Sequence, residues 1–188
     1  FKGLSPWMQK LPGGLIHVNV VGCALFAAIS GSSAATVATV GKMSIPELRK
    51  RKYPEKILLG SLAGSGTLGL LIPPSIILII YGVTVQESIA KLFIAGIFPG
   101  IMIALIFMSY VIIWSLANNK IMPKVHERSS FLDKVKKSKQ LLPVILLILG
   151  VIGSIYTGVA TATEAASLGV VGALTLSYFQ KSLNLKTF

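Results

Sequence analysis

The sequence contains few charged residues, few acids and almost no cysteine. Charged side chains make up 13% of the 188 residues, whereas a soluble domain carries about a quarter. The single cysteine, Cys23, cannot form an internal disulfide, and its apolar neighbours predict a small buried packing residue. Hydrophobic residues reach 53% and the mean hydropathy is +0.78. Together these values exclude an ordinary soluble domain and favour a membrane protein.

The residue groups that carry enzyme chemistry are also missing. The sequence shows no cluster with metal-ligand spacing and no nucleophile with a base at a plausible distance. The glycine-rich stretch "GSGTLG" lies inside an apolar run and opens no strand-to-helix unit, so it does not predict a phosphate loop. We therefore expect no enzyme and no cofactor. A net charge of +12 would suggest nucleic acid in a soluble chain, but here the basic residues flank apolar runs, which predicts membrane-bordering loops and no nucleic acid partner.

The distribution of basic residues predicts a topology. They cluster between residues 49 and 56 and between residues 120 and 139, and the positive-inside rule places both clusters in the cytoplasm. The chain is then expected to cross the membrane from Ile57, turn outside near residues 83–87 and return by Leu116. The long apolar stretch 141–178 is expected to go out and back, with its turn near residues 157–163.

The first apolar segment has a different pattern. Lys10 and Arg49 should both be cytoplasmic, so the chain between them must enter the membrane and return to the same side. Its apolar parts, 14–29 and 34–45, are separated by "SGSS" and are each too short to cross a hydrocarbon core of about 30 Å comfortably. This pattern predicts a re-entrant helical hairpin over 11–46, with its polar tip lining a cavity. The alternative is a pair of short, tilted helices joined outside the membrane.

The stretch "LAGSGTLGLLIPPSIILII" predicts a broken transmembrane helix over 57–82. Pro73 and Pro74 supply no backbone N–H, and their rings crowd the preceding turn. Three glycines precede them, which goes beyond a single proline kink. We expect two half-helices joined by an extended link near the membrane midplane. In secondary transporters such breaks offer helix N-termini to anions and unwound carbonyls to cations.

Two residue pairs have the spacing of a capping box, in which the side chains at the start of a helix bond to its first N–H groups. Thr84 and Glu87 are expected to start the helix that returns from the outer turn. Thr161 and Glu164 are expected to start the last helix. Because an acid within a membrane segment is a candidate functional residue, ion binding by Glu164 is the alternative to capping, and the two roles are compatible.

Four sequence blocks carry a family resemblance. These are "LPGGLIHVNVVGCALFAAISGSSAATVATVG", "GSGTLGLLIPPSIILIIYGV", "LFIAGIFPGIMIAL" and "IYTGVATATEAASLGVVGAL". In order and spacing they resemble the large membrane subunit of TRAP transporters, the tripartite ATP-independent periplasmic family (DctM-like), over nearly the whole chain. One departure is Ala162, which stands where the family's "TPTEAA" has proline. Family members are about twice as long, so this chain corresponds to about half a subunit.

The resemblance implies a fold and a function. The fold is an all-α integral membrane protein, half of an inverted-repeat elevator-type transporter. The function is that of a multi-pass subunit in the bacterial inner membrane, part of a sodium-coupled importer of small organic anions such as C4-dicarboxylates, sialic acid or other sugar acids. Its implied partners are a small DctQ-like membrane subunit, a DctP-like periplasmic solute-binding protein and the lipid bilayer. A channel-like pore or a non-transporting scaffold subunit is the alternative.

The expected organisation follows from these arguments. Residues 1–82 form part of a transport domain, comprising the hairpin 11–46, a basic cytoplasmic loop 47–56 and the broken helix 57–82. Residues 83–117 form an arm or scaffold transmembrane helix, 118–140 a basic cytoplasmic loop, and 141–188 transmembrane helices that begin the second half.

The expected binding residues lie at the hairpin tip and in the broken helix. At the tip they are Ser30, Gly31, Ser32, Ser33 and Thr36. In the broken helix they are Gly64, Ser65, Gly66, Thr67, Gly69, Ile72, Pro73, Pro74 and Ser75. Sodium is the expected coupling ion, held through Ser32, Ser33, Gly66 and Thr67. Thr161, Thr163 and Glu164 are further candidates.

Overall fold

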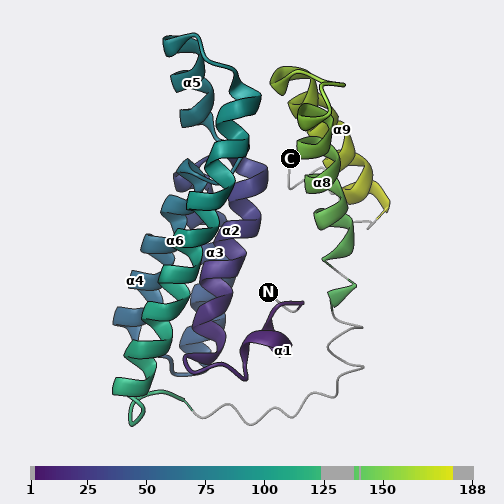
Figure 1. Cartoon of the computed structure of the whole chain (residues 1–188). Helices are drawn as coiled ribbons and strands as arrows, with labels where there is room; N and C mark the ends of the chain where they lie inside the picture. Colours follow the sequence, from purple (N-terminus) through teal and green to yellow (C-terminus); the bar gives the residue numbers. More distant parts are fainter. Residues whose placement is uncertain (1–2, 124–137, 140, 180–188) are drawn as a thin grey trace. The chain divides into compact units, whose positions relative to one another are not determined.

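The structure is a computed structural model that describes residues 3–123, 138, 139 and 141–179. Within these residues the chain is helical and contains no strand, as expected for an all-α protein. It divides into two compact units, Phe1–Ser138 and Lys139–Phe188, and each is described by itself below. Figure 1 shows the helices of both units.

The first unit begins with a helical hairpin. After the short helix α1 (Ser5–Met8) and the 3-10 turn η1 (Gly14–Ile16), the arms are α2 (His17–Ser30) and α3 (Ser33–Lys50). Only Gly31 and Ser32 separate the arms. Gly31 ends α2 in the left-handed conformation (φ 58°), and the Ser32 hydroxyl accepts from the Ala35 N–H to begin α3. The helix–turn–helix is confirmed, whereas its re-entrant placement in a membrane stays a prediction.

The break in the helix is confirmed, whereas its place near the midplane of a membrane stays a prediction. Its first half is α4 (Glu55–Gly66), which continues as the 3-10 helix η2 (Thr67–Leu70), and its second half is α5 (Ile76–Val85). Residues 71–75 between them are not helical, and the Pro73–Pro74 peptide bond is cis. The break falls where two consecutive residues lack the N–H that an α-helix requires.

One long helix follows, α6 (Ile89–Ala117), with Pro99 inside it. Among the described residues this is the one helix long and apolar enough to cross a membrane; Gly14–Ser30, Ile76–Val85 and Leu142–Tyr156 are apolar but shorter. The expected Thr84–Glu87 capping box is wrong. Helix α5 extends to Val85, so Thr84 bonds back to the Ile80 carbonyl, and Ser88 caps α6 by accepting from the Lys91 N–H.

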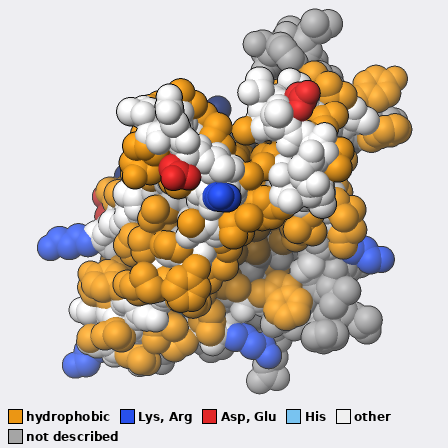
Figure 2. Space-filling view, turned by 45° about the horizontal axis from the view of Figure 1, so that its top comes forward, with side chains coloured by type: hydrophobic (Ala, Val, Ile, Leu, Met, Phe, Trp, Pro, Cys, Tyr) orange, Lys and Arg blue, Asp and Glu red, His pale blue; other side chains and the backbone are white. Residues whose placement is uncertain are grey.

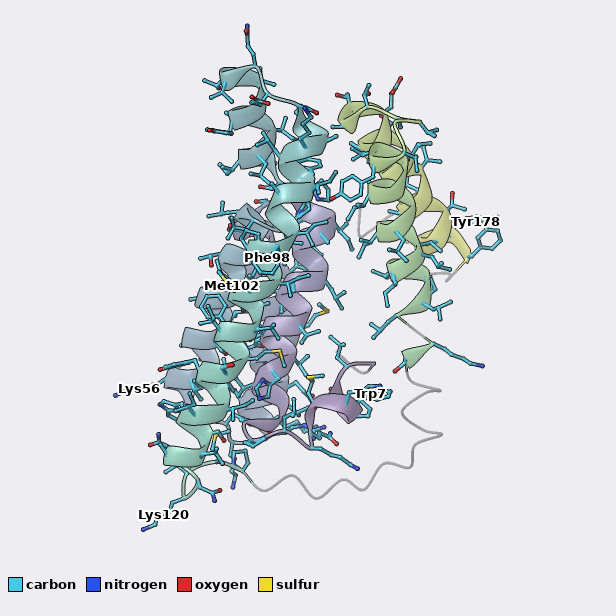
Figure 3. All side chains as sticks on the ribbon, viewed as in Figure 1. Trp7, Lys56, Phe98, Met102, Lys120 and Tyr178 are labelled. Carbon is cyan, nitrogen blue, oxygen red and sulfur yellow. The ribbon has the colours of Figure 1, made fainter. Side chains whose placement is uncertain are left out.

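The basic segment 47–56 is mostly helical rather than a loop. Helix α3 continues through Pro46 to Lys50 and α4 begins at Glu55, which leaves residues 51–54 as the connection. Two ion pairs join its charges, Arg49 to Glu55 at 2.9 Å and Arg51 to Glu47 at 2.8 Å. Lys56 and Lys120 lie at the same end of the first unit (Figure 3). Most of the expected loop 118–140 lies outside the described residues.

Helices α2, α3 and α4 pack on one another as the core of the first unit. Buried Cys23, Val40 and Leu62 contact one another at mid-height, which confirms the expected role of Cys23. A larger apolar cluster around Leu15, Leu48 and Leu58 closes the end nearest the basic segment. Between them the buried Asn19 amide donates to the Leu58 carbonyl and the Ser61 hydroxyl, so α2 and α4 share polar as well as apolar contacts.

The outer surfaces of α5 and α6 are strongly apolar. Large side chains such as Ile80, Phe98 and Leu105 are more than half exposed. Figure 2 shows hydrophobic side chains over much of the face turned toward the viewer. Since soluble proteins rarely expose apolar patches of this extent, the surface is suited to lipid or to further membrane helices.

The second unit is an antiparallel helical hairpin of α8 (Leu142–Tyr156) and α9 (Ala162–Phe179). The turn falls within the predicted range 157–163. At the start of α9 the Glu164 carboxylate accepts from the Thr161 N–H and hydroxyl, both at 2.8 Å, and the Glu164 N–H donates to the Thr161 hydroxyl oxygen at 3.3 Å. The second capping box is therefore confirmed.

Candidate functional site

The hairpin tip and the broken-helix link meet in the first unit. The Ile76 N–H, at the start of α5, donates to the Gly31 carbonyl at 3.3 Å. A Cβ added to Gly31 would lie 2.7 Å from the Pro74 carbonyl oxygen, a distance that real Cβ atoms do not adopt. Residues 45 positions apart in the sequence therefore touch through their backbones.

Two more glycines bring the backbones of η2 and α4 against the hairpin. A Cβ on Gly69 would lie 2.9 Å from both the Ser32 carbonyl carbon and the Ser33 nitrogen. A Cβ on Gly66 would overlap the Val37 side chain of α3. Both positions therefore need glycine because the chains approach too closely for any side chain, which is the reason for the glycine-rich run before the prolines.

Hydroxyl groups stabilise the tip. The Thr36 side chain is fully buried, and its hydroxyl donates to the Ser32 carbonyl at 2.7 Å and also lies 3.0 Å from the Ser30 hydroxyl. The Ser32 N–H lies 3.3 Å from the Ser30 hydroxyl oxygen, to which it donates. Ser30 and Thr36 thus hold the turn in shape, and their oxygens are engaged within the hairpin.

The remaining candidate hydroxyls differ in their bonding. The buried Ser33 hydroxyl has no hydrogen-bond partner in the described structure, so its oxygen is available to a ligand. The Thr67 hydroxyl is exposed and donates to the Gly64 carbonyl at 2.6 Å. The Ser65 hydroxyl donates to the Ser61 carbonyl, and that of the buried Ser75 donates to the Leu70 carbonyl at 2.7 Å. Each of these three hydroxyl groups is therefore engaged as a donor to a backbone carbonyl.

Two candidates lie on the other side of the broken helix. Gly64 faces Phe107 of α6, and the Ile72 side chain packs against Gly100 of the same helix. These contacts attach the broken helix to α6, and Ile72 also packs against the cluster that contains Val20 and Ala27 of α2. The close fit of Gly96 against the Leu71 carbonyl, where a Cβ would lie at 2.8 Å, extends the same interface.

Thr161, Thr163 and Glu164 lie in the second unit, at the start of α9. The Thr161 and Glu164 side chains bond to each other as described above, and the Thr163 carbonyl accepts from the Ser167 hydroxyl. Capping accounts for these contacts, and ion binding by Glu164 stays a prediction.

Four helix ends therefore come together at one point. The C-terminal ends of α2 and η2 bring carbonyl oxygens with partial negative charge, and the N-terminal ends of α3 and α5 bring N–H groups with partial positive charge. Such a junction is suited to a small cation beside an anion, without any charged side chain. Within the described part of the chain, no group of three or more His, Cys, Asp or Glu side chains is placed to hold a metal ion.

Sequence reasoning missed two parts of this junction. Val37, which packs over Gly66, reads as an ordinary apolar residue one turn into α3. The Ile76 N–H acts through its backbone, which no residue type indicates. Their positions were the available signal, because Ile76 is the first residue of α5 and Val37 lies in the first turns of α3.

A hairpin packed against a discontinuous helix, with the helix ends meeting, is typical of secondary transporters. The comparisons with known proteins agree. A family model described as "Tripartite ATP-independent periplasmic transporter, DctM component" matches residues 8–188. The chain therefore belongs to the DctM family of TRAP transporters, as the four sequence blocks indicated.

Several characterised relatives are similar over most of the chain. It is 42% identical over 159 residues to the C4-dicarboxylate TRAP transporter large permease protein DctM of Pseudomonas aeruginosa, a match that covers 85% of this chain and 36% of that protein. It is 38% identical over 174 residues to the isethionate TRAP transporter permease protein DctMQ of Oleidesulfovibrio alaskensis, covering 92% and 27%. It is also 38% identical over 175 residues to the ectoine/5-hydroxyectoine large permease UehC of Ruegeria pomeroyi, covering 90% and 39%.

The family membership supports two coarser conclusions. The family model describes a transporter component, so the chain belongs to a family of membrane permeases. The matched segments make up between 27% and 39% of these three relatives, so the chain spans well under half of their length.

Proposed function

We propose that this chain forms part of the ion- and substrate-binding region of a sodium-coupled importer of small organic anions in a bacterial inner membrane. The observation that carries the proposal is the junction of the hairpin tip with the broken helix, through the Ile76 N–H and the Gly31 carbonyl. The junction gathers neutral oxygens and helix N-termini, the groups that hold a sodium ion and a carboxylate in secondary transporters.

Sodium would bind on the side where α2 and η2 end. The Ser33 hydroxyl supports this assignment because it is buried and has no partner among the described atoms. The Ser33 carbonyl oxygen would lie 3.8 Å from a Cβ on Gly66, so the first turn of α3 lies close to the end of α4. Ser32 and Thr67 complete the proposed set. Ion binding would stabilise the tip against the link, and the anion would then meet the N-termini of α3 and α5.

The complete protein would act with partners. A periplasmic binding protein would deliver the substrate, and a small membrane subunit would complete the complex. The name DctMQ of the isethionate relative is consistent with a joined pair of subunits. Relatives are named for C4-dicarboxylates, isethionate and ectoines. Because the chain resembles the first of these most strongly among the three, a C4-dicarboxylate is the first substrate to test. Movement of the hairpin and broken helix as one elevator-type body belongs to the same proposal.

Uptake by the full-length permease, assembled with its partners in proteoliposomes, tests the proposal. We expect uptake to require an inward sodium gradient and the binding protein. Ser33→Ala should raise the sodium concentration for half-maximal uptake by about tenfold, since a hydrogen-bonding oxygen at a charge contributes roughly 1.5–3 kcal/mol, and Ser32→Ala and Thr67→Ala should act in the same direction. Ser109→Ala on α6, whose exposed hydroxyl bonds within its own helix, is the control. Sodium-independent uptake, or unchanged sodium dependence in all three variants, would overturn the proposal.

A further inference from the structure

The exposed face of α3 differs from the exposed faces of α5 and α6. One exposed face of α3 carries Ala35, Ala38, Lys42, Pro46 and Arg49, at the i, i+3, i+4 spacing of one helix face, and the exposed Met43 lies at its edge. Within the described residues, the 18-residue helix α3 is not among the helices apolar enough to cross a membrane, whereas its partner arm α2 belongs to the shorter apolar helix Gly14–Ser30. If the predicted hairpin enters the membrane, this mostly small and polar face does not suit contact with lipid tails.

Lys42 occupies the middle of that face. It lies nine residues after Ser33 and eight before Lys50, which at about 1.5 Å per residue is roughly 13 Å from the tip and 12 Å from the basic end. Its side chain is exposed, and no ion pair joins it to an acid in the described residues. The nearest acid along the helix, Glu47, is bonded to Arg51.

A lone ammonium group at this depth needs water or an anion near it. Intramembrane lysines face a bundle interior or a water-filled cavity and pair with a partner. The hairpin prediction already places its tip beside a cavity, and α3 leads from that tip to the basic segment. The exposed surfaces of α5 and α6, by contrast, are apolar and suited to lipid. Helix α6 exposes large side chains such as Phe98 and Met102, whereas α3 exposes alanines and a lysine (Figure 3).

We infer that the face of α3 formed by Ala35, Ala38 and Lys42 lines a water-filled passage between the hairpin tip and the basic end, and that Lys42 attracts small organic anions moving along it. The inference rests on the proposed function for the identity of the passenger. The charge of Lys42 is complementary to an anion. Because Lys42 lies midway between the tip and the basic end, it would act as a specificity-determining residue on the path rather than as part of the sodium site.

Cysteine labelling of the full-length permease in membrane vesicles tests the passage. In a background in which every cysteine of the full-length permease, Cys23 included, is replaced by serine, Ala35→Cys and Ala38→Cys should react readily with charged, membrane-impermeant methanethiosulfonates. The matched controls Phe98→Cys and Met102→Cys on the apolar face of α6 should react far more slowly. Slow reaction at positions 35 and 38, equal to that of the α6 controls, would overturn the inference.

A second labelling measurement tests whether the charge of Lys42 attracts anions. Ala38 is one helical turn from Lys42, so the anionic sulfonatoethyl reagent should react faster there than the cationic trimethylammonium reagent. Lys42→Gln should reduce the ratio of the two rates by about fivefold, the size expected for a unit charge about 8 Å away in water acting on both reagents with opposite sign. Lys42→Arg should preserve the ratio. A ratio unaffected by Lys42→Gln would overturn the role of Lys42.

Transport kinetics separate this inference from the proposed function. Lys42→Gln should raise the KM for a dicarboxylate several-fold while the sodium dependence of uptake stays unchanged. If uptake proves independent of sodium but positions 35 and 38 label quickly, the sodium proposal fails and the passage stands. If uptake follows sodium but these positions label slowly, the passage fails and the sodium proposal stands.

Discussion

Single residues decide how closely the hairpin approaches the broken helix. Gly31 combines a left-handed backbone with contact to the Pro74 carbonyl, and Gly69 lies against the backbone of Ser32 and Ser33. A side chain at either position would separate the two segments. By contrast Gly60 on α4 and Gly150 on α8 have no atom within 4 Å of an added Cβ, so glycine itself is not required there by packing. The sequence alone does not distinguish these classes of glycine.

Gly31→Ala tests this contact. The left-handed conformation costs an alanine roughly 1–2 kcal/mol, and the clash with Pro74 adds to this cost. The population of the conformation in which the hairpin tip contacts the broken helix should therefore fall at least about fivefold. We expect sodium-dependent uptake by the full-length permease to fall accordingly. Gly60→Ala is the matched control and should leave uptake unchanged, since its Cβ meets open space. Equal uptake in the two variants would show that the tip contact is not needed for transport.

At the scale of helices, the chain places each break where the local chemistry requires it. Gly31 and Ser32 end one helix and begin the next, and the two prolines interrupt the broken helix between η2 and α5. Pro46 behaves differently, because it lies inside α3 without ending it. A single proline removes one backbone hydrogen bond, and the packing of α3 against α2 and α4 offsets this loss at Pro46. Two consecutive prolines remove two such bonds and crowd the preceding turn, so the helix ends before Pro73 and Pro74.

The capping box at the start of α9 separates the two roles considered for Glu164. Thr161→Ala removes the hydroxyl that accepts from the Glu164 N–H and should destabilise the helix start by about 1 kcal/mol, seen as a lower melting temperature of the purified complex. Glu164→Gln keeps the capping geometry and removes the charge. If capping is its whole role, Glu164→Gln should transport normally with unchanged sodium dependence. A raised sodium requirement in Glu164→Gln, with an unchanged melting temperature, would show instead that Glu164 binds the ion.

At the scale of the whole molecule, charge separates the two ends of the first unit. The connection 51–54 and the start of α4 lie at the end that carries Lys56 and Lys120, while the α5–α6 turn lies at the opposite end (Figures 1 and 3). The length of α6, 29 residues or about 43 Å at 1.5 Å per residue, is sufficient to cross the hydrocarbon core. The positive-inside rule then predicts which end faces the cytoplasm.

Sided labelling tests this orientation. Both Lys50 at the end of α3 and Glu87 in the α5–α6 turn are exposed, so a cysteine at either position should react. In the same cysteine-free background, Lys50→Cys should react with an impermeant maleimide only from the cytoplasmic side, and Glu87→Cys only from the periplasmic side. The cysteine-free parent alone should remain unlabelled. Reaction of both positions from one side would contradict the assignment of the broken helix and α6 as membrane-crossing segments.

The helical class, the two helices of the hairpin, the break in the next helix and the family could all be predicted from the amino-acid sequence, because they follow from local chemistry. Apolar run lengths, a Ser-Gly turn and paired prolines act within a few residues of where they stand, and the family motifs are contiguous. Local reasoning was less successful at element ends, as the Thr84–Glu87 pair and the overestimated loop 47–56 show, since packing extended α3 and α5 beyond their local signals.

Which of the predicted site residues meet depends on how the helices pack. Ser33, Gly66 and Gly69 lie at the hairpin junction, whereas Gly64 faces α6 and Ile72 packs against both α6 and α2, although all of them belong to the same two sequence blocks. The face that a helical residue presents depends on how three helices pack around a shared apolar core, and small rotations about a helix axis move a residue from one neighbour to another. For the same reason the Ile76 N–H and Val37 became visible as parts of the junction only when the hairpin and the broken helix were seen together.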